Sequence, residues 1–139
     1  MQGIAKGLIA LWTGSLLTAC GLVAPAAFAV LATRGEAGKI TGAVFRAQGW
    51  IGLVILALIT FLWWKLPQRT VGASDYALLG LATVAPWVGA IALHPAMERA
   101  RTLPDMRTFG ILHGVSGLLF ATACIAGLAL TVLLSRRAG

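Results

Sequence analysis

The fold is decided by residues 108–135, which read TFGILHGVSGLLFATACIAGLALTVLLS and contain no Asp, Glu, Lys or Arg. Three further stretches, 7–33, 47–64 and 76–97, are also free of these charges. A helix needs about 20 residues to cross the ~30 Å hydrocarbon core of a bilayer, and about 17–25 are accepted. All four stretches meet this length, and together they take up 95 of the 139 residues.

The composition excludes a water-soluble domain, a disulfide scaffold and a disordered tail. Apolar residues make up 59% of the chain and charged residues 11%, which is more apolar surface than a small domain can bury. The stretches also lack the alternating pattern of barrel strands. The sequence therefore predicts an all-α fold, an integral membrane four-helix up-down bundle. It forms a single domain over 1–139, with spans at about 5–33, 46–66, 75–97 and 108–135.

The first stretch has two features of processed segments. Lys6, the apolar run and Ala27-Phe28-Ala29 resemble a secretory signal, and Leu17-Thr18-Ala19-Cys20 resembles a lipoprotein-processing site. The run is longer than a signal core, which is usually about 7–15 residues, and it contains Pro25. These properties favour a helix that is retained.

The charge distribution points to lipid as the partner. The formal net charge is +7, and four spans divide the Lys and Arg residues five to six between the two membrane faces. This near balance leaves the orientation open under the positive-inside rule. It favours contact with anionic headgroups on both faces, and no segment has the pattern expected for binding nucleic acid.

Small residues and aromatic residues predict how the helices pack. In lipid, helices associate through close backbone approach at small residues. Trp50 and Trp63-Trp64 bracket the second stretch, as expected at two membrane interfaces, and Pro86 with Gly89 predicts a kink in the third. The glycines expected to mediate packing, within one chain or in a homodimer, are Gly3, Gly7, Gly14, Gly21, Gly110, Gly114 and Gly117.

Polar residues gather at one membrane face of an up-down bundle. His94 and His113 lie near the ends of sequential spans, so their imidazoles are expected at similar depth. Imidazole is a ligand for copper, zinc and iron, whereas a simple hydrogen-bonding role is the more ordinary alternative. The candidate polar site comprises His113, Ser116, His94, Arg46, Gln48, Glu98 and Arg101.

The two cysteines form a weaker metal candidate. Cys20 and Cys124 fall near the middle of the first and fourth spans, where a thiol pair could hold a soft ion such as Cu(I). Buried cysteine more often behaves as a small apolar residue. The sequence thus leaves any cofactor unassigned: none is the favoured expectation, with haem or copper as alternatives.

Four sequence blocks resemble the transmembrane protein 205-like family, a group of small four-span membrane proteins without an established reaction. The resemblance implies an integral membrane protein, expected here in the bacterial inner membrane. Eukaryotic relatives of the family are associated with tolerance to platinum drugs, which implies handling of soft metals or of vesicle traffic. The chain departs from the family at His94. The blocks are Gly14-Ser15, Val23-Ala24-Pro25-x-x-Phe28, Ala37-Gly38-x-Ile40-x-Gly42-x-x-Phe45 and Phe109-x-x-Leu112-His113-Gly114-x-Ser116.

The sequence contains no motif typical of an enzyme. Phosphate-binding loops, His-Glu-x-x-His and Cys-x-x-Cys are absent, and no acid lies in the charge-free spans. The favoured function is therefore a non-enzymatic membrane protein that associates with itself or with a larger membrane complex. Two alternatives stay open: a metal- or haem-binding protein that uses His94 and His113, and an efflux or permeation protein for a metal or toxic cation.

Overall fold

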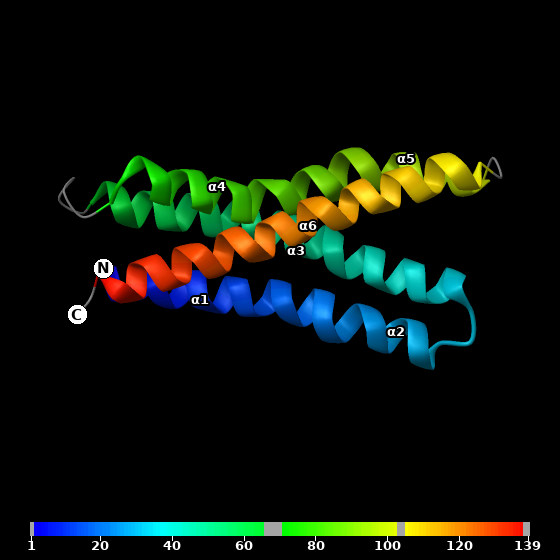
Figure 1. Cartoon of the computed structure of the whole chain (residues 1–139), viewed down its shortest axis with the longest axis horizontal. Coiled ribbons are helices and arrows are strands. Elements are labelled where there is room, and N and C mark those ends of the chain that lie inside the picture. Colours follow the sequence, from blue (N-terminus) through cyan, green and yellow to red (C-terminus); the bar gives the residue numbers. More distant parts are fainter. Residues whose placement is uncertain (1, 66–70, 103–104, 138–139) are drawn as a thin grey trace.

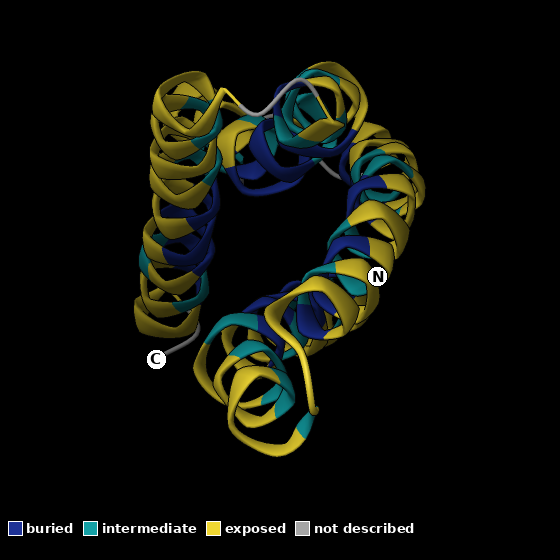
Figure 2. Cartoon of the chain, turned by 90° about the vertical axis from the view of Figure 1, so that its right-hand side faces the viewer, coloured by how far each residue is buried: buried dark blue, intermediate teal, exposed yellow. Residues whose placement is uncertain are grey.

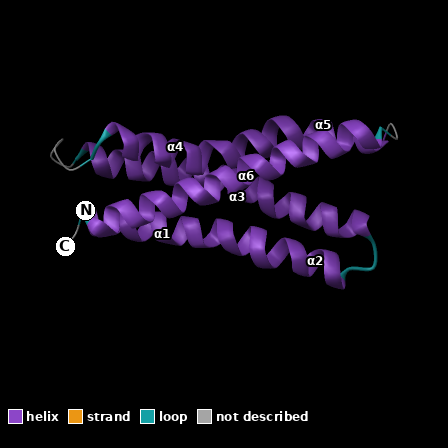
Figure 3. Cartoon of the chain, viewed as in Figure 1, coloured by secondary structure: helices purple, strands orange, loops and turns teal. Residues whose placement is uncertain are grey.

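Long helices make up almost all of the described chain. The computed structural model describes residues 2–65, 71–102 and 105–137 (Figures 1 and 3). Four continuous helical segments are long and apolar enough to cross a membrane: Gln2–Val30, Arg34–Trp64, Ala73–Thr102 and Met106–Arg136. The prediction of an all-helical chain with four such segments is confirmed.

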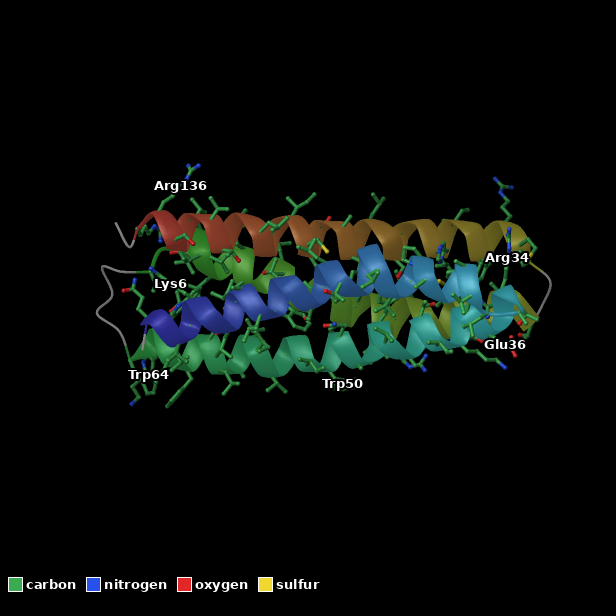
Figure 4. The ribbon with its side chains drawn as sticks, turned by 90° about the horizontal axis from the view of Figure 1, so that it is seen from below. Lys6, Arg34, Glu36, Trp50, Trp64 and Arg136 are labelled. Atoms are coloured by element: carbon green, nitrogen blue, oxygen red, sulfur yellow. The ribbon has the colours of Figure 1, made fainter. Side chains whose placement is uncertain are left out.

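Two of the helices are longer than the charge-free stretches indicated. Helix α3 runs Arg34–Trp64, so it begins about 12 residues before the predicted span, and the third segment continues to Thr102. The absence of charge predicts which residues can lie in hydrocarbon, but it does not predict where a helix begins. A helix begins at the residue that caps its first backbone N–H groups. The side chain of Thr33 accepts from the Glu36 backbone and the Glu36 carboxylate accepts from the Thr33 N–H, which forms a capping box. Trp50 consequently lies midway along α3 rather than at its end (Figure 4).

The first and third segments each contain one π-helical turn. In the first, α1 (Gln2–Thr18) leads through η1 (Ala19–Val23) into α2 (Ala24–Val30). In the third, α4 (Ala73–Val88) leads through η3 (Gly89–Leu93) into α5 (His94–Thr102).

Proline explains the position of both π-helical turns. Pro25 and Pro95 each follow a turn by two residues, and a proline lacks the N–H that a regular helix would bond four residues back. The kink expected at Pro86 and Gly89 corresponds to η3, which starts at Gly89 and ends just before His94-Pro95. Pro86 itself is buried inside α4.

One half of the bundle has a closed core, and we call it the closed half. Helix α6 (Met106–Arg136) packs on α1 and α4, and α3 packs on the same two helices, so the four form a ring. The dark-blue buried residues face inward in Figure 2. The first core cluster draws on all four helices: Ala5, Ile9, Ile59, Trp63, Leu79, Leu130 and Leu134. The second consists of Trp12, Leu16, Ala85, Phe120, Ala123 and Cys124.

The glycines that pack the helices differ from those predicted. A Cβ atom on Gly49 would lie 3.1 Å from the Trp87 Cα of α4, and one on Gly52 would lie 3.0 Å from the Thr83 carbonyl oxygen. Gly127 of α6 has the same role against Thr13 of α1. A Cβ on any of the predicted glycines, in contrast, meets no atom within 4 Å, so the expected packing within one chain is wrong: Gly3, Gly7, Gly14, Gly21, Gly110, Gly114 and Gly117.

The other half of the bundle is open. Beyond the π-helical turns, α2 packs on α3 and α5 packs on α6, whereas neither α2 with α6 nor α3 with α5 forms an extended contact among the described residues. The two helix pairs diverge at this end in Figure 1. Neither core cluster contains a residue of α2 or α5. We call this region the open half.

Candidate functional site

The open half contains a cavity of about 670 Å3 between its two helix pairs. This volume lies within the range of about 300–1,000 Å3 that is typical of ligand sites. Its rim includes Arg34 and Arg101, and its depth reaches Cys20, Phe45 and Phe120. Arg34 and Phe45 are about 16 Å apart along the axis of α3, at about 1.5 Å per residue. The cavity therefore extends from the charged end of the bundle to the edge of its apolar core.

A glycine notch on α3 receives the imidazole of His94. A Cβ on Gly42 would lie 2.6 Å from His94 Nε2, so only glycine leaves space for this ring. The Arg46 guanidinium lies 2.7 Å from Nε2 and 3.2 Å from Nδ1 of the same ring. A guanidinium can only donate, so the imidazole nitrogen that accepts must be unprotonated. This contact links α3 to α5 and holds His94 at the cavity wall.

One helical turn earlier in α3, Gly38 receives a second side chain of α5. A Cβ on Gly38 would lie 3.1 Å from a terminal nitrogen of Arg101. The Arg101 guanidinium lies 3.6 Å from the Glu98 carboxylate and 5.1 Å from the ring centroid of Phe109. The Phe109 ring in turn stacks on His113 with centroids 5.9 Å apart. Arg101, Phe109 and His113 thus form a continuous row across α5 and α6.

The charge of the cavity lining is positive. Three arginines line it, Arg34, Arg46 and Arg101, and Glu98 is the only acid among its described lining residues. The ion pair between Glu98 and Arg101 is partly exposed, so its contribution to stability is small. The lining therefore carries an excess of two positive charges, if both histidines are neutral.

Asp105 fixes the helix start beside this rim. Its carboxylate accepts from the Thr108 backbone N–H at 3.0 Å and caps α6. Hydrogen bonds from the side chain and then the backbone of Thr108 hold the pKa of Asp105 below its usual value. The carboxylate therefore stays charged, and the first turn of α6 stays in place, under mildly acidic conditions.

Six of the seven predicted polar residues line this one cavity. They come from three helices: Arg46, His94, Glu98, Arg101, His113 and Ser116. Gln48 does not belong to the lining. Its amide donates to the Ser15 carbonyl at 3.3 Å and accepts from the Ser15 hydroxyl at 3.3 Å, so it ties α3 to α1 instead.

The metal candidates do not form a ready coordination site. Cys20 lines the cavity and packs against the core cluster that contains Cys124. His94 and His113 lie on the same cavity but are engaged by Arg46 and Phe109, respectively. Within residues 2–65, 71–102 and 105–137, no three His, Cys, Asp or Glu side chains come together as a metal-binding group.

The sequence did not single out the aromatic and glycine residues of the cavity as functional. Phe28 of α2, Phe45 of α3 and both Phe109 and Phe120 of α6 line it. Phe28, Phe45 and Phe109 do occur in the sequence blocks of the family resemblance, and these blocks could have pointed to them as functional residues. The Arg137 contact with buried Asp75 at the opposite end was also missed, since the two residues are 62 positions apart.

Residues 7–105, more than two thirds of the chain, match the model of a domain of unknown function, DUF4149. The chain therefore belongs to this family. Nothing in the match supports the narrower likeness to the transmembrane protein 205-like family, and the block Phe109–Ser116 lies outside the matched residues. Comparisons with curated proteins and with solved structures give no match.

Proposed function

We propose that this family member is a non-enzymatic accessory protein of the bacterial inner membrane, which holds an amphiphilic membrane component in its open half. The observation that carries the proposal is the cavity itself, charged at its rim and apolar at its depth. A ligand with one polar end and one apolar end matches this gradient.

The outer surface of the bundle is suited to surrounding lipid. Large apolar side chains are exposed along its length, including Leu11, Val54 and Leu118. Such a surface is unfavourable in water and ordinary in hydrocarbon. Charged residues lie near the two ends, as Lys6 and Arg136 at one end and Arg34 and Glu36 at the other illustrate (Figure 4).

Residues of α2 and α6 both line the cavity, and these helices form no extended contact among the described residues, so we infer a lateral opening between them. A ligand dissolved in the bilayer can reach the cavity sideways, without crossing water. Such a route suits a membrane amphiphile, whose apolar part can stay in hydrocarbon while it passes between α2 and α6.

Native mass spectrometry of the protein released from nanodiscs tests this function. We expect phospholipid to stay bound to the wild-type chain and to be lost from Gly117→Leu. Gly117 lines the cavity, and a Cβ added to it would meet no atom within 4 Å. The Cβ of a leucine at this position therefore clears its neighbours, and we expect the rest of the side chain to occupy cavity space.

Gly114→Leu is the matched control, because Gly114 is an equally open glycine on the same helix but does not line the cavity. It should retain the bound lipid. Equal retention by both variants, or no lipid bound to the wild-type chain, would contradict the proposed function.

Self-association, or assembly with a larger membrane complex, is a second candidate. Gly110 and Gly114 of α6 are exposed, with no atom within 4 Å of an added Cβ, so a second helix could approach closely there. Crosslinking in native membranes tests this candidate. A dimer that Gly110→Ile abolishes is the expected result, and a strictly monomeric chain without partners would contradict it.

A metal or haem bound by His94 and His113 is a narrower proposal, supported by the position of both imidazoles on one cavity. Metal analysis and an absorption spectrum of the purified protein test it. A stoichiometric metal or a Soret band that is lost in His113→Ala would support the proposal. Absence of both signals from the wild-type protein would contradict it.

A further inference from the structure

The charges at the rim narrow the chemistry of the bound amphiphile. We propose that the open half selects an anionic phospholipid, with its headgroup phosphate between Arg34 and Arg101 and an acyl chain between α2 and α6. The inference rests on the proposed function and adds the class of ligand to it.

The two rim arginines approach the cavity from opposite helix pairs. Arg34 is the first residue of α3, and Arg101 lies near the end of α5. Gly38 positions Arg101 across the gap, since its missing side chain leaves space for the guanidinium. Guanidinium groups bind phosphate oxygens through paired, charge-assisted hydrogen bonds.

Among the described lining residues, the two rim arginines have only one acid to offset their charge. Glu98 is the only acid in the described lining, and it is 3.6 Å from Arg101, which leaves Arg34 without an acidic neighbour there. Arg46 is directed to His94 and contributes a third positive charge deeper in the wall. An anionic headgroup would balance this excess, whereas the ammonium group of a zwitterionic lipid would lie against like charge.

The lateral opening suits the acyl chain. On α2, Phe28 and Val30 are exposed, and on α6, Ile111 and Leu118 are exposed. These residues give the helices that flank the opening an apolar surface toward the surrounding hydrocarbon. Inside the cavity, Phe45 and Phe120 lie 4.6 Å apart by ring centroid and form an aromatic floor for the chain end.

The decisive experiment compares phosphatidylglycerol with phosphatidylcholine in native mass-spectrometric titrations of the full chain. We expect the wild-type chain to prefer phosphatidylglycerol, and Arg34→Gln/Arg101→Gln to lose at least about fivefold of that preference. One arginine near a membrane surface contributes about fivefold in binding to anionic lipid.

The matched control is Arg99→Gln/Arg107→Gln, which removes the same charge from the same end of the bundle but from residues outside the cavity lining. This control should keep the wild-type preference. If both double variants lose it equally, general surface charge explains the binding and the inference is overturned.

The remaining outcomes separate the inference from the proposed function. Equal binding of both lipids, still lost in Gly117→Leu, would overturn the anionic selectivity and leave the lipid-holding function intact. If Gly117→Leu binds both lipids as strongly as the wild-type chain does, the anionic selectivity and the lipid-holding function are both overturned. Circular dichroism checks that each variant folds, and if the double variant does not fold, Arg34→Gln alone provides the test because Arg34 is exposed.

Discussion

The closed half and the open half of this bundle use the same four helical segments in different ways. In the closed half, Trp12 is buried among three helices: its indole lies against Gly52 of α3 and donates to the Ala82 carbonyl of α4 at 3.2 Å. In the open half, Arg46 of α3 and His94 of α5 make a polar contact across the gap between the helix pairs. The π-helical turns η1 and η3 lie between the two regions.

This difference teaches how a bundle of four long apolar helices can keep a stable core and still provide a cavity. Apolar burial does not drive helices together in lipid, so close packing and polar contacts must stabilise them. Close packing is concentrated in the closed half, which contains both core clusters. The open half can then depart from close packing, because it does not have to hold the helices together.

The largest effect is expected at the Asp75–Arg137 pair, which joins α4 to the end of α6. The Asp75 side chain is fully buried, and Arg137 lies 2.5 Å from its Oδ2. Arg137→Ala leaves a buried charge unpaired, which costs up to about 3 kcal/mol. The measurement is the midpoint of thermal unfolding in detergent.

Arg136→Ala, the adjacent exposed arginine, is the control and should leave the midpoint nearly unchanged. Asp75→Asn combined with Arg137→Ala should recover part of the loss, since no buried charge remains. An unchanged midpoint in Arg137→Ala would show that this pair does not hold the closed half together.

Alanine substitutions at two glycines of α3, one in each half, allow the two halves to be compared directly. Gly49→Ala drives a methyl group into the backbone of α4 and should lower stability by about 1–3 kcal/mol. Gly42→Ala meets only the end of the His94 side chain, so it should displace that ring and weaken lipid binding at a smaller cost in stability. Unfolding midpoints measure the loss of stability, and lipid titrations measure the loss of binding. A larger loss of stability in Gly42→Ala than in Gly49→Ala would contradict the distinction between the two halves.

A smaller effect is expected for the central hydrogen bond. Trp12→Phe keeps an aromatic ring against Gly52 but removes the donor to the Ala82 carbonyl, at a cost of about 1 kcal/mol. Trp64→Phe, an exposed position on α3, is the control. Equal stability of Trp12→Phe and the wild-type chain would mean that packing alone fixes α1 in the closed half.

The smallest expected effect concerns pH and the start of α6 in the open half. The pKa of Asp105 is lowered by its hydrogen bonds with Thr108, so the cap is present above the ordinary carboxyl pKa of about 3.9 and is lost as the pH falls through the lowered value. The Thr108 amide resonance should report this transition. This pH transition should be absent in Asp105→Asn. If it persists in that variant, a group other than Asp105 causes it.

Sequence reasoning predicted the parts of this fold that depend on composition alone. A bilayer needs long apolar helices, so the four segments could be read from the absence of charge. The gathering of His94, His113 and Arg46 at one end followed from up-down connectivity, and the structure places all three on one cavity.

The remaining features depend on matched surfaces, which one helix cannot reveal. Gly14 and Gly52 are equally small, but only Gly52 faces a helix backbone. The cavity was not predictable either, because it depends on which helices fail to pack on each other beyond η1 and η3. The early start of α3 was missed because Lys39 and Arg46 interrupt the apolar stretch without interrupting the helix.

We infer that the closed and open ends lie on opposite sides of a membrane and that water reaches the cavity only from the side of the open end. In a chain whose two native cysteines are replaced by alanine, a membrane-impermeant maleimide can be applied to oriented vesicles carrying a single cysteine at Ala32, Ala73 or Ser116. We predict that Ala32→Cys and Ser116→Cys react from one side and Ala73→Cys from the other. Reaction of Ala32→Cys and Ala73→Cys from the same side would contradict the account.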